Sequence, residues 1–190
     1  MTAAKIDIHP LSLSRLEDFL AFFDNAAFSD NPEWGFCYCQ CFLEDHGKID
    51  WPARTGGENR SLACERIASG VMRGLLAYAE GKVVGWCNAA PRPLIHALDD
   101  EPIRDAEQTG TIICFLVDPA LRGRGIARAL LDGACDAFRA QGLSRVEANP
   151  RPEETGDGPN HFGPMRMYLD AGFSVSRQDQ DGSVWVERNL

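Results

Sequence analysis

Hydrophobic and polar residues alternate along some stretches of this chain and recur every three or four positions along others, which predicts strands mixed with helices. Lys5 to Pro10 alternates and favours a strand. A helix capped by Ser12 or Ser14 should follow, because apolar residues recur at helical spacing, at Leu16, Phe19, Leu20 and Phe23. Residues 29 to 59 indicate mostly loop, with one short extended piece.

A second helix should begin at Asn59 or Ser61 and end at Ser69. After it, the hydrophobic pattern changes from a helical period to an alternating one. Two apolar runs follow, residues 74 to 80 and residues 82 to 90, and they meet at Glu80-Gly81-Lys82. A short glycine-containing junction between two such runs is typical of a β-hairpin. Residues 91 to 108 then form a connection rich in proline and acidic residues.

A buried strand and a strongly amphipathic helix dominate the second half of the chain. Thr109 to Asp118 is a nearly continuous apolar run, as expected for a strand covered on both faces, and Pro119 ends it. Arg124 to Gln141 has apolar residues at helical spacing, and Gly142 is a suitable stop. Leu143 to Ala148 favours a strand, so this strand–helix–strand unit predicts a right-handed parallel crossover.

The C-terminal part should close the sheet. Residues 149 to 163 form a long loop, and long loops in compact domains are often functional. Met165 to Ala171 predicts a short helix. Residues 173 to 177 and 183 to 188 predict an antiparallel pair around Asp181-Gly182. With no linker or repeat in view, we expect residues 1–190 to form a single domain.

Composition narrows the class of protein. The chain has 190 residues, is 44% hydrophobic and carries a net charge of −9, which argues against nonspecific binding to nucleic acid or to an anionic membrane. It shows neither a spanning apolar run nor an export signal, so its seven cysteines are expected to be reduced thiols in a cytoplasmic protein.

The junction between the buried strand and the long helix has the composition of an anion site. The strand ends in Phe115-Leu116-Val117, and the helix follows a glycine turn, Arg122-Gly123-Arg124-Gly125, continuing into Ile126-Ala127. Free main-chain amides and the positive end of the helix dipole favour a phosphate there. Arg122, Arg124 and Arg128 crowd positive charge at that same end. The alternative is a glycine turn with solvated arginines.

Other phosphate-binding patterns fit this turn less well. The Walker pattern needs Gly-Lys-Ser/Thr, which is absent, and the dinucleotide fingerprint needs Gly or Ala where Arg128 stands. A nucleotide-binding protein therefore remains only a third choice.

The residues of this turn resemble those of a known family. Arg122-Gly123-Arg124-Gly125-Ile126-Ala127 is similar to the Arg/Gln-x-x-Gly-x-Gly/Ala signature of the GNAT superfamily of N-acetyltransferases, and Val117-Asp118-Pro119 and Leu130-Leu131 fit on either side. A second block, Tyr168-Leu169-Asp170-Ala171-Gly172-Phe173, resembles that family's Tyr-x-x-x-Gly-Phe element. The resemblance covers about residues 72 to 190, and Gly163-Pro164-Met165 is among the runs that point to a little-described bacterial subgroup.

The resemblance implies a fold and a reaction. The fold is an α/β (α+β) arrangement: a mixed, mostly antiparallel twisted sheet flanked by helices, with a central splayed parallel pair. The reaction transfers an acetyl group from acetyl-CoA, as cosubstrate, to a primary amine of a small molecule or peptide. The cofactor-binding residues implied are Phe115, Leu116, Val117, Arg122, Gly123, Arg124, Gly125, Ile126 and Ala127. The main alternative is a non-catalytic acyl-CoA-binding or regulatory domain.

The catalytic residues are a proton donor and a base. Tyr168 matches the family's general acid, and a phenol of pKa near ~10 can protonate a thiolate of similar basicity. The attacking amine must be neutral, and Glu147, near the end of the partner strand, is the candidate base. In many members of the family that this chain resembles, water accepts the proton of the amine in place of a side chain. No metal is expected, and exposed edge strands in this fold also allow a homodimer.

Cysteines and aromatic residues are dense between residues 34 and 51. Cys37, Cys39 and Cys41 alternate, so in an extended segment all three thiols would face one side. The stronger interpretation of these three cysteines is that they are buried thiols or thiols of a substrate pocket. The weaker one is that they bind zinc, with His46 or Cys64 as the fourth ligand. The aromatic residues either cover the acceptor pocket or form a satellite core, and they are Trp34, Phe36, Tyr38 and Trp51.

Overall fold

The computed structural model describes residues 5–101, 103–150 and 160–190. A single seven-stranded sheet runs through these residues in the order β1-β2-β3-β4-β5-β7-β6. The strands are β1 (Asp7–Pro10), β2 (Leu75–Ala79), β3 (Lys82–Pro91), β4 (Thr109–Val117), β5 (Arg145–Ala148), β6 (Ser174–Gln178) and β7 (Val184–Asn189). All neighbours are antiparallel except β4 and β5, which confirms the expected fold class.

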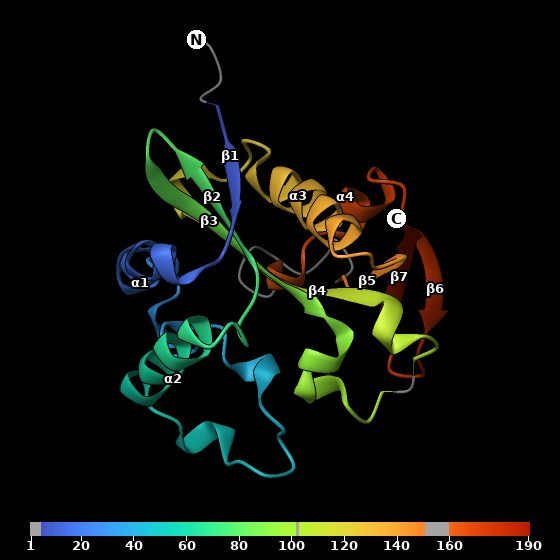
Figure 1. The fold of residues 1–190 in the computed structure, drawn as a ribbon, viewed down its shortest axis with the longest axis horizontal. Helices are drawn as coiled ribbons and strands as arrows, with labels where there is room; N and C mark the ends of the chain where they lie inside the picture. The colour runs from blue at the N-terminus through green and yellow to red at the C-terminus, as the bar shows by residue number, and fades with distance from the viewer. Residues whose placement is uncertain (1–4, 102, 151–159) are drawn as a thin grey trace.

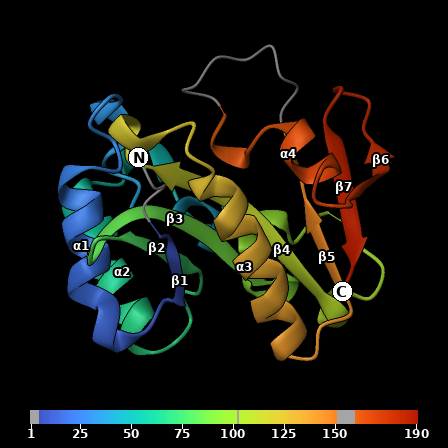
Figure 2. The same cartoon turned by 90° about the horizontal axis from the view of Figure 1, so that it is seen from above.

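Helices cover both faces of the sheet (Figures 1 and 2). They are α1 (Leu16–Asn25), α2 (Gly56–Ala68), α3 (Ile126–Ala140) and α4 (Met165–Leu169). The stripe of α3, including Leu130, Ala134 and Phe138, packs on one face. Phenylalanines of α1 pack on the other face, around Leu76 and Trp86. Among the described residues no helix combines the length and the apolar composition that crossing a bilayer requires.

The parallel pair separates halfway along β4. Pairing of β4 with β5 runs from Thr109 to Ile112, whereas β4 itself continues to Val117. On its other edge β4 stays paired with β3 from Gly110 to Val117, with Ile113 as an extra residue where the register shifts between Asn88 and Ala89. Such a bulge bends a strand and increases its twist. The second half of β4 therefore has one edge that β5 does not cover.

The first 60 residues depart most from the sequence expectations. The α2 helix begins at Gly56, earlier than Asn59 or Ser61, because Thr55 and Glu58 form a reciprocal capping box. Ser12 precedes only a 3₁₀ turn, without a side-chain cap, and α1 begins after Arg15. The extended piece expected between residues 29 and 59 is wrong, since that segment contains 3₁₀ turns and bends.

Candidate active site

The glycine turn leaves an open space above its main chain. Gly123 has φ +73° and Gly125 has φ +81°, left-handed values that favour glycine. A Cβ built on either residue would meet no atom within 4 Å. Asp118 shapes the approach to the turn, because its carboxylate accepts the Ala120 amide at 3.0 Å. The turn thus exposes backbone to a space large enough for a ligand group.

The N-terminus of α3 faces this space without a cap of its own. Gly125 is the N-cap and offers no side chain, and the first turn holds no acidic residue. The first main-chain bond runs from the Ala129 amide to the Gly125 carbonyl at 3.0 Å, so the preceding amides have no partner within the helix. Unpaired amides and the helix dipole together suit an anion such as a diphosphate.

Two of the three arginines at this helix end already have acidic partners, which weakens the sequence argument that their crowded positive charge favours an anion there. Arg122 contacts Asp30 at 2.5 Å, and this bidentate bond lowers the pKa of the Asp30 carboxyl. Arg128 contacts Asp132 at 2.9 Å. Arg124 is exposed and makes no ion pair with any part of the chain that the structure describes. The main chain of the turn, more than its arginine charge, defines the site.

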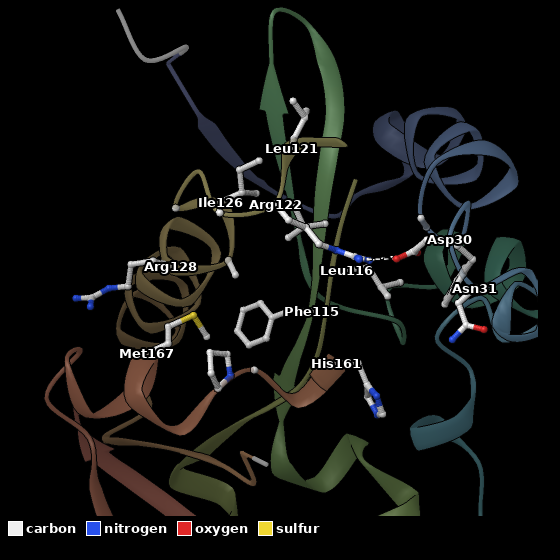
Figure 3. Close-up of a pocket in the computed structure, with 18 of the residues that line it drawn as sticks. Asp30, Asn31, Phe115, Leu116, Leu121, Arg122, Ile126, Arg128, His161 and Met167 are labelled. Carbon is white, nitrogen blue, oxygen red and sulfur yellow. Dashed lines mark hydrogen bonds and ion pairs between the residues drawn. The ribbon is translucent and has the colours of Figure 1, made fainter. Parts of the chain in front are cut away.

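A cleft of about 310 Å³ extends from the turn along the second half of β4, and we call it the β4 cleft (Figure 3). Eight of the nine predicted cofactor-binding residues line it; the exception is Arg124. The other walls come from distant segments, at Ala27 to Trp34 and at His161 to Met167. The structure therefore brings the predicted residues together and adds walls that the motifs did not indicate.

The main chain of β4 presents polar groups to the edge that β5 leaves. The Asp118 amide donates to the Val84 carbonyl at 3.0 Å. Because bonded and non-bonded pairs alternate in antiparallel strands, Leu116 also bonds to β3, while the amides and carbonyls of Phe115 and Val117 point to the opposite edge. An extended, amide-containing ligand in the cleft can thus add to the sheet there.

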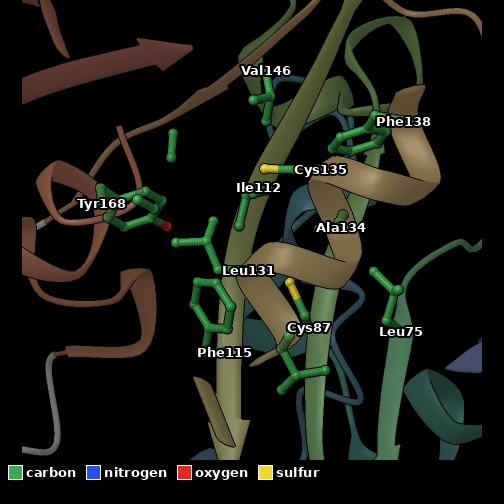
Figure 4. Packing of buried hydrophobic residues seen from close by; sticks show 14 of the residues in the cluster. Leu75, Cys87, Ile112, Phe115, Leu131, Ala134, Cys135, Phe138, Val146 and Tyr168 are labelled. Atoms are coloured by element: carbon green, nitrogen blue, oxygen red, sulfur yellow. The ribbon is translucent and has the colours of Figure 1, made fainter. Parts of the chain in front are cut away.

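Tyr168 lies in the core beside the cleft, not on its wall. Its side chain is 0% exposed, and its ring lies beside Phe115, with ring centroids 6.4 Å apart (Figure 4). The hydroxyl donates to the Phe162 carbonyl at 2.8 Å. Burial raises the pKa of Tyr168 well above its ordinary value, so the phenol stays protonated. The Tyr168 hydroxyl therefore carries a proton, and in this structure it donates that proton in a hydrogen bond to a main-chain carbonyl.

Glu147 lies on β5, away from the lining of the β4 cleft. Its carboxylate accepts the Thr111 hydroxyl at 2.9 Å and lies 3.5 Å from the buried Arg92 guanidinium. Burial raises the pKa of Glu147, and Arg92 partly opposes that shift. These contacts tie β5 to β4 and to the 3₁₀ turn that follows β3, just before the parallel pair separates.

The cysteine segment is not extended, which corrects the basis on which its thiols were expected to share a face. Tyr38 and Cys39 have left-handed φ values of 42° and 54°. Cys37, Cys39 and Cys41 nevertheless line one cavity, because the turn brings them to the same side. Within the described ranges, no three His, Cys, Asp or Glu side chains are arranged to hold a metal ion. Of the aromatic residues, Tyr38 belongs to the core, where its hydroxyl donates to Asp24 at 2.6 Å.

Sequence reasoning missed several residues of the site. Asp30, which pairs with Arg122, comes from a loop, and His161, which lines the far end of the cleft, comes from a 3₁₀ turn; neither segment carries a motif. Gly163 and Met167 also line the cleft, and the Gly163-Pro164-Met165 run was their only signal. Loop residues like these acquire a role only through contacts with segments far away in the chain.

Comparisons with known proteins agree on the family. The model of the acetyltransferase (GNAT) family matches residues 31–157. A 39-residue segment, 20% of this chain, is 54% identical to part of the mycothiol acetyltransferase of Beutenbergia cavernae, and it spans only 13% of that protein.

Two solved structures illustrate the shared fold. The GNAT domain of S. lividans PAT has a TM-score of 0.61 and 19% identity, over 96% of this chain and 89% of that one. The PaiA N-acetyltransferase from Thermoplasma acidophilum, in complex with coenzyme A, has a TM-score of 0.57 and 18% identity, over 98% and 99% of the two chains. At these identities the likeness shows the fold alone.

Proposed function

This chain belongs to the acetyltransferase (GNAT) family, and on that premise we propose that it transfers an acetyl group from acetyl-CoA to a primary amine of a small molecule or peptide. The observation that carries the proposal is the open glycine turn, with φ +73° and +81°, leading directly into the β4 cleft. One end of the cleft suits the diphosphate of acetyl-CoA, and the length of the cleft suits the extended, amide-containing arm that carries the acetyl group. We treat residues 1–190 as one such domain.

Different residues of the cleft bind different parts of acetyl-CoA. The amides of the glycine turn and of Ile126 and Ala127 hold the diphosphate, assisted by the α3 dipole. The outward main-chain groups of Phe115 and Val117 pair with the amide-bearing arm, and the Phe115 and Leu116 side chains exclude water. Acetyl-CoA supplies a thioester, whose carbonyl carbon accepts an amine.

The reaction needs one bond made, one broken and one proton moved. The amine nitrogen bonds to the acetyl carbon, the carbon–sulfur bond breaks, and the proton lost by nitrogen balances the proton gained by sulfur. We propose Tyr168 as the donor to sulfur, once its hydroxyl rotates away from the Phe162 carbonyl. Burial raises the pKa of Tyr168 and so weakens it as an acid, and the transfer therefore requires that the same apolar surroundings also raise the basicity of the departing thiolate. The nearby buried ring of Phe115 limits access of water.

The role of Glu147 as general base stays a prediction. A raised pKa suits a group that must accept a proton near neutral pH. Its contacts with Thr111 and Arg92 favour a second role, in which it holds β5 against its neighbours where the parallel pair separates. Glu147→Gln distinguishes the two roles, because it removes the charge and keeps the shape of the side chain.

We also propose a cytoplasmic location. All seven cysteines are free, and free thiols are typical of reducing compartments. The acidic net charge of −9 favours small or peptidic amines over nucleic acid as partners.

Calorimetry and a thiol assay together test the function. Titration with acetyl-CoA should show saturable binding, and a panel of primary amines should then release free CoA and yield N-acetylated products detected by mass spectrometry. Saturable binding without transfer to any amine in the panel would support the non-catalytic alternative. Binding of ATP that displaces CoA would favour a nucleotide-binding protein instead.

A further inference from the structure

A second cavity, of about 290 Å³, adjoins the β4 cleft, and we call it the thiol cavity. Its walls include the thiols of Cys37, Cys39 and Cys41 and the rings of Trp34, Phe36 and Trp51. None of the described residues that line it is Lys, Arg, Asp or Glu. Burial raises the pKa of Cys37 to about 12 and that of Cys41 to about 11, so both are neutral, weakly polar groups.

The thiol cavity borders one end of the β4 cleft. Trp34, Leu116 and His161 line both spaces, and the Trp34 and His161 rings meet edge to face at 5.6 Å. The glycine turn lines only the cleft. In Figure 3 His161 lies on the opposite side of Leu116 from Leu121 and Ile126, so the shared wall is at the end of the cleft away from the turn. Whatever occupies the thiol cavity therefore faces the end of the cleft remote from the diphosphate.

The wall of the thiol cavity has a fixed shape. Tyr38 and Cys39 adopt left-handed conformations that non-glycine residues rarely keep unless their surroundings hold them. Here the Gln40 side chain donates to the Tyr38 carbonyl at 2.9 Å, and the Trp86 indole N–H donates to the Cys39 sulfur at 3.1 Å. Held strain of this kind is concentrated at functional sites, and a small, preformed apolar space is typical of a ligand pocket.

We propose that the thiol cavity is the acceptor site, and that it takes a primary amine carried on a small aromatic or other apolar group. The proposal rests on the acetyl transfer proposed above and deepens it by naming the substrate class. The apolar group fills the space between the rings and thiols, and the amine faces the cleft past Trp34 and His161. A cavity of about 290 Å³ limits that group to roughly one or two rings.

The same wall assists the chemistry. An ammonium group entering an apolar space without a carboxylate partner loses solvation, so its pKa falls and the neutral amine becomes more populated. The neutral nitrogen then attacks the acetyl carbon, and its proton leaves to water or to a base as the carbon–sulfur bond breaks. The cavity thus reduces the demand on any general base, in agreement with the absence of Glu147 from its lining.

A neighbouring acidic cavity of about 400 Å³ offers the competing site. Glu101, Asp179 and Trp185 are among its walls, and it would suit a substrate with a second positive charge. However, Arg177 already pairs with Glu101 at 2.8 Å and with Asp179 at 2.7 Å. Among the residues that the structure describes, the acidic cavity shares no lining residue with the β4 cleft, whereas the thiol cavity shares four.

Competing substrates test the proposal in the wild-type protein. We expect kcat/KM for 2-phenylethylamine to exceed that for 1,4-diaminobutane by at least about 10-fold, because only the first buries an apolar group without a second charge. Equal rates, or a preference for the diamine, would overturn the proposal and assign the acceptor to the acidic cavity.

Two tryptophan variants locate the site. Trp51→Ala enlarges the thiol cavity, so the ratio of kcat/KM for tryptamine to that for 2-phenylethylamine should rise by about 10-fold. Trp185→Ala makes the matched change in the acidic cavity and should leave the ratio unchanged. Retained acetyl-CoA binding shows that each variant is folded. A shift in the ratio for Trp185→Ala and none for Trp51→Ala contradicts the proposal.

Ligand binding without turnover separates the two proposals. The probe is the ¹⁹F resonance of 2-(4-fluorophenyl)ethylamine, recorded in the presence of free CoA. This resonance should broaden when the amine binds to the wild-type protein or to Trp185→Ala. It should stay sharp with Cys41→Phe, because the larger side chain fills the thiol cavity. Broadening without acetylation of any amine would reject acetyl transfer and keep the cavity as a binding site. Acetylation of amines with equal broadening in Cys41→Phe would keep acetyl transfer and reject the cavity as the acceptor site.

Discussion

The β4 cleft and the thiol cavity share a wall but are built from different parts of the chain. In the cleft, the groups that we propose hold acetyl-CoA are largely main-chain groups of β4, the glycine turn and the first turn of α3. In the thiol cavity, the groups that we propose hold the acceptor are side chains, drawn from residues 28 to 51, from β4 and from His161. Main chain keeps its hydrogen-bonding groups whatever the side chain, whereas a side-chain wall changes with each substitution. Substitutions in the cavity can therefore change the acceptor while leaving the binding of acetyl-CoA intact.

The largest effect should follow from a change in the glycine turn. Gly125→Asp places a side chain on a residue with φ +81° and a negative charge at the diphosphate site, so acetyl-CoA affinity should fall by about 100-fold or more. Gly142→Asp is the matched control, because Gly142 also has φ +81° and open surroundings but lies at the other end of α3. Isothermal titration calorimetry measures both. Equal losses in the two variants would mean that backbone strain, not the anion site, is responsible.

An intermediate effect should follow from removal of one hydroxyl beside the cleft. Tyr168→Phe removes the proposed donor, so kcat should fall by roughly 10- to 100-fold while acetyl-CoA affinity changes little. Tyr78→Phe removes a hydroxyl that donates to Asp18 at 2.7 Å, far from the cleft in the sheet, and should leave kcat unchanged. Steady-state kinetics and calorimetry check both variants. Parallel losses of turnover and affinity in Tyr168→Phe would assign the hydroxyl to structure alone.

The smallest effect on turnover should come from Glu147, which lies outside the lining of both regions. Glu147→Gln keeps the shape of the side chain and removes its charge. If the residue mainly holds β5 in place, kcat/KM should change by less than about 3-fold, because Gln keeps an oxygen that can accept the Thr111 hydroxyl and the side chain lines neither region. A fall above about 100-fold, together with loss of the acid limb of the pH–rate profile, would instead establish Glu147 as the base.

The same variant has a signature in stability against pH. The pKa of Glu147 in the folded protein is raised above its ordinary value of 4.5, so the folded state binds more protons than the unfolded state in this range. The contribution of this group to stability therefore falls as pH increases from 4.5 through the raised value. Glu147→Gln should lessen that decline, as measured by thermal unfolding across the same pH range. An unchanged slope would contradict the raised pKa.

Local sequence patterns predicted most elements of the second half of the fold. The β2–β3 hairpin, the buried β4 strand and the α3 stripe were all indicated by periods of two or of three to four residues. Prediction failed in residues 29 to 59, where no single period dominates and 3₁₀ turns follow one another. The capping box at Thr55 and Glu58 was present in the sequence, but the glycines after Thr55 obscured it.

In the candidate site, too, features set by neighbouring residues were predictable and features set by distant contacts were not. The glycine turn was evident because its conformation depends on adjacent residues, and Gly123 and Gly125 supply the left-handed φ values that it needs. The partners of the arginines were not evident, since Asp30 reaches Arg122 across 92 positions of the chain. The sequence therefore showed the crowding of positive charge at this turn but not the acidic partners that compensate part of it.

The sequence by itself determined the strand, the turn and the helix that carry the proposed diphosphate site, because hydrogen bonds and dihedral angles between near neighbours set all three. Only the tertiary structure decided where β5 leaves β4, which loops close the cleft, and that three thiols and a group of aromatic rings enclose one apolar space beside it. Those features depend on the packing of segments far apart in the chain, and periodicity within any one segment does not specify such packing.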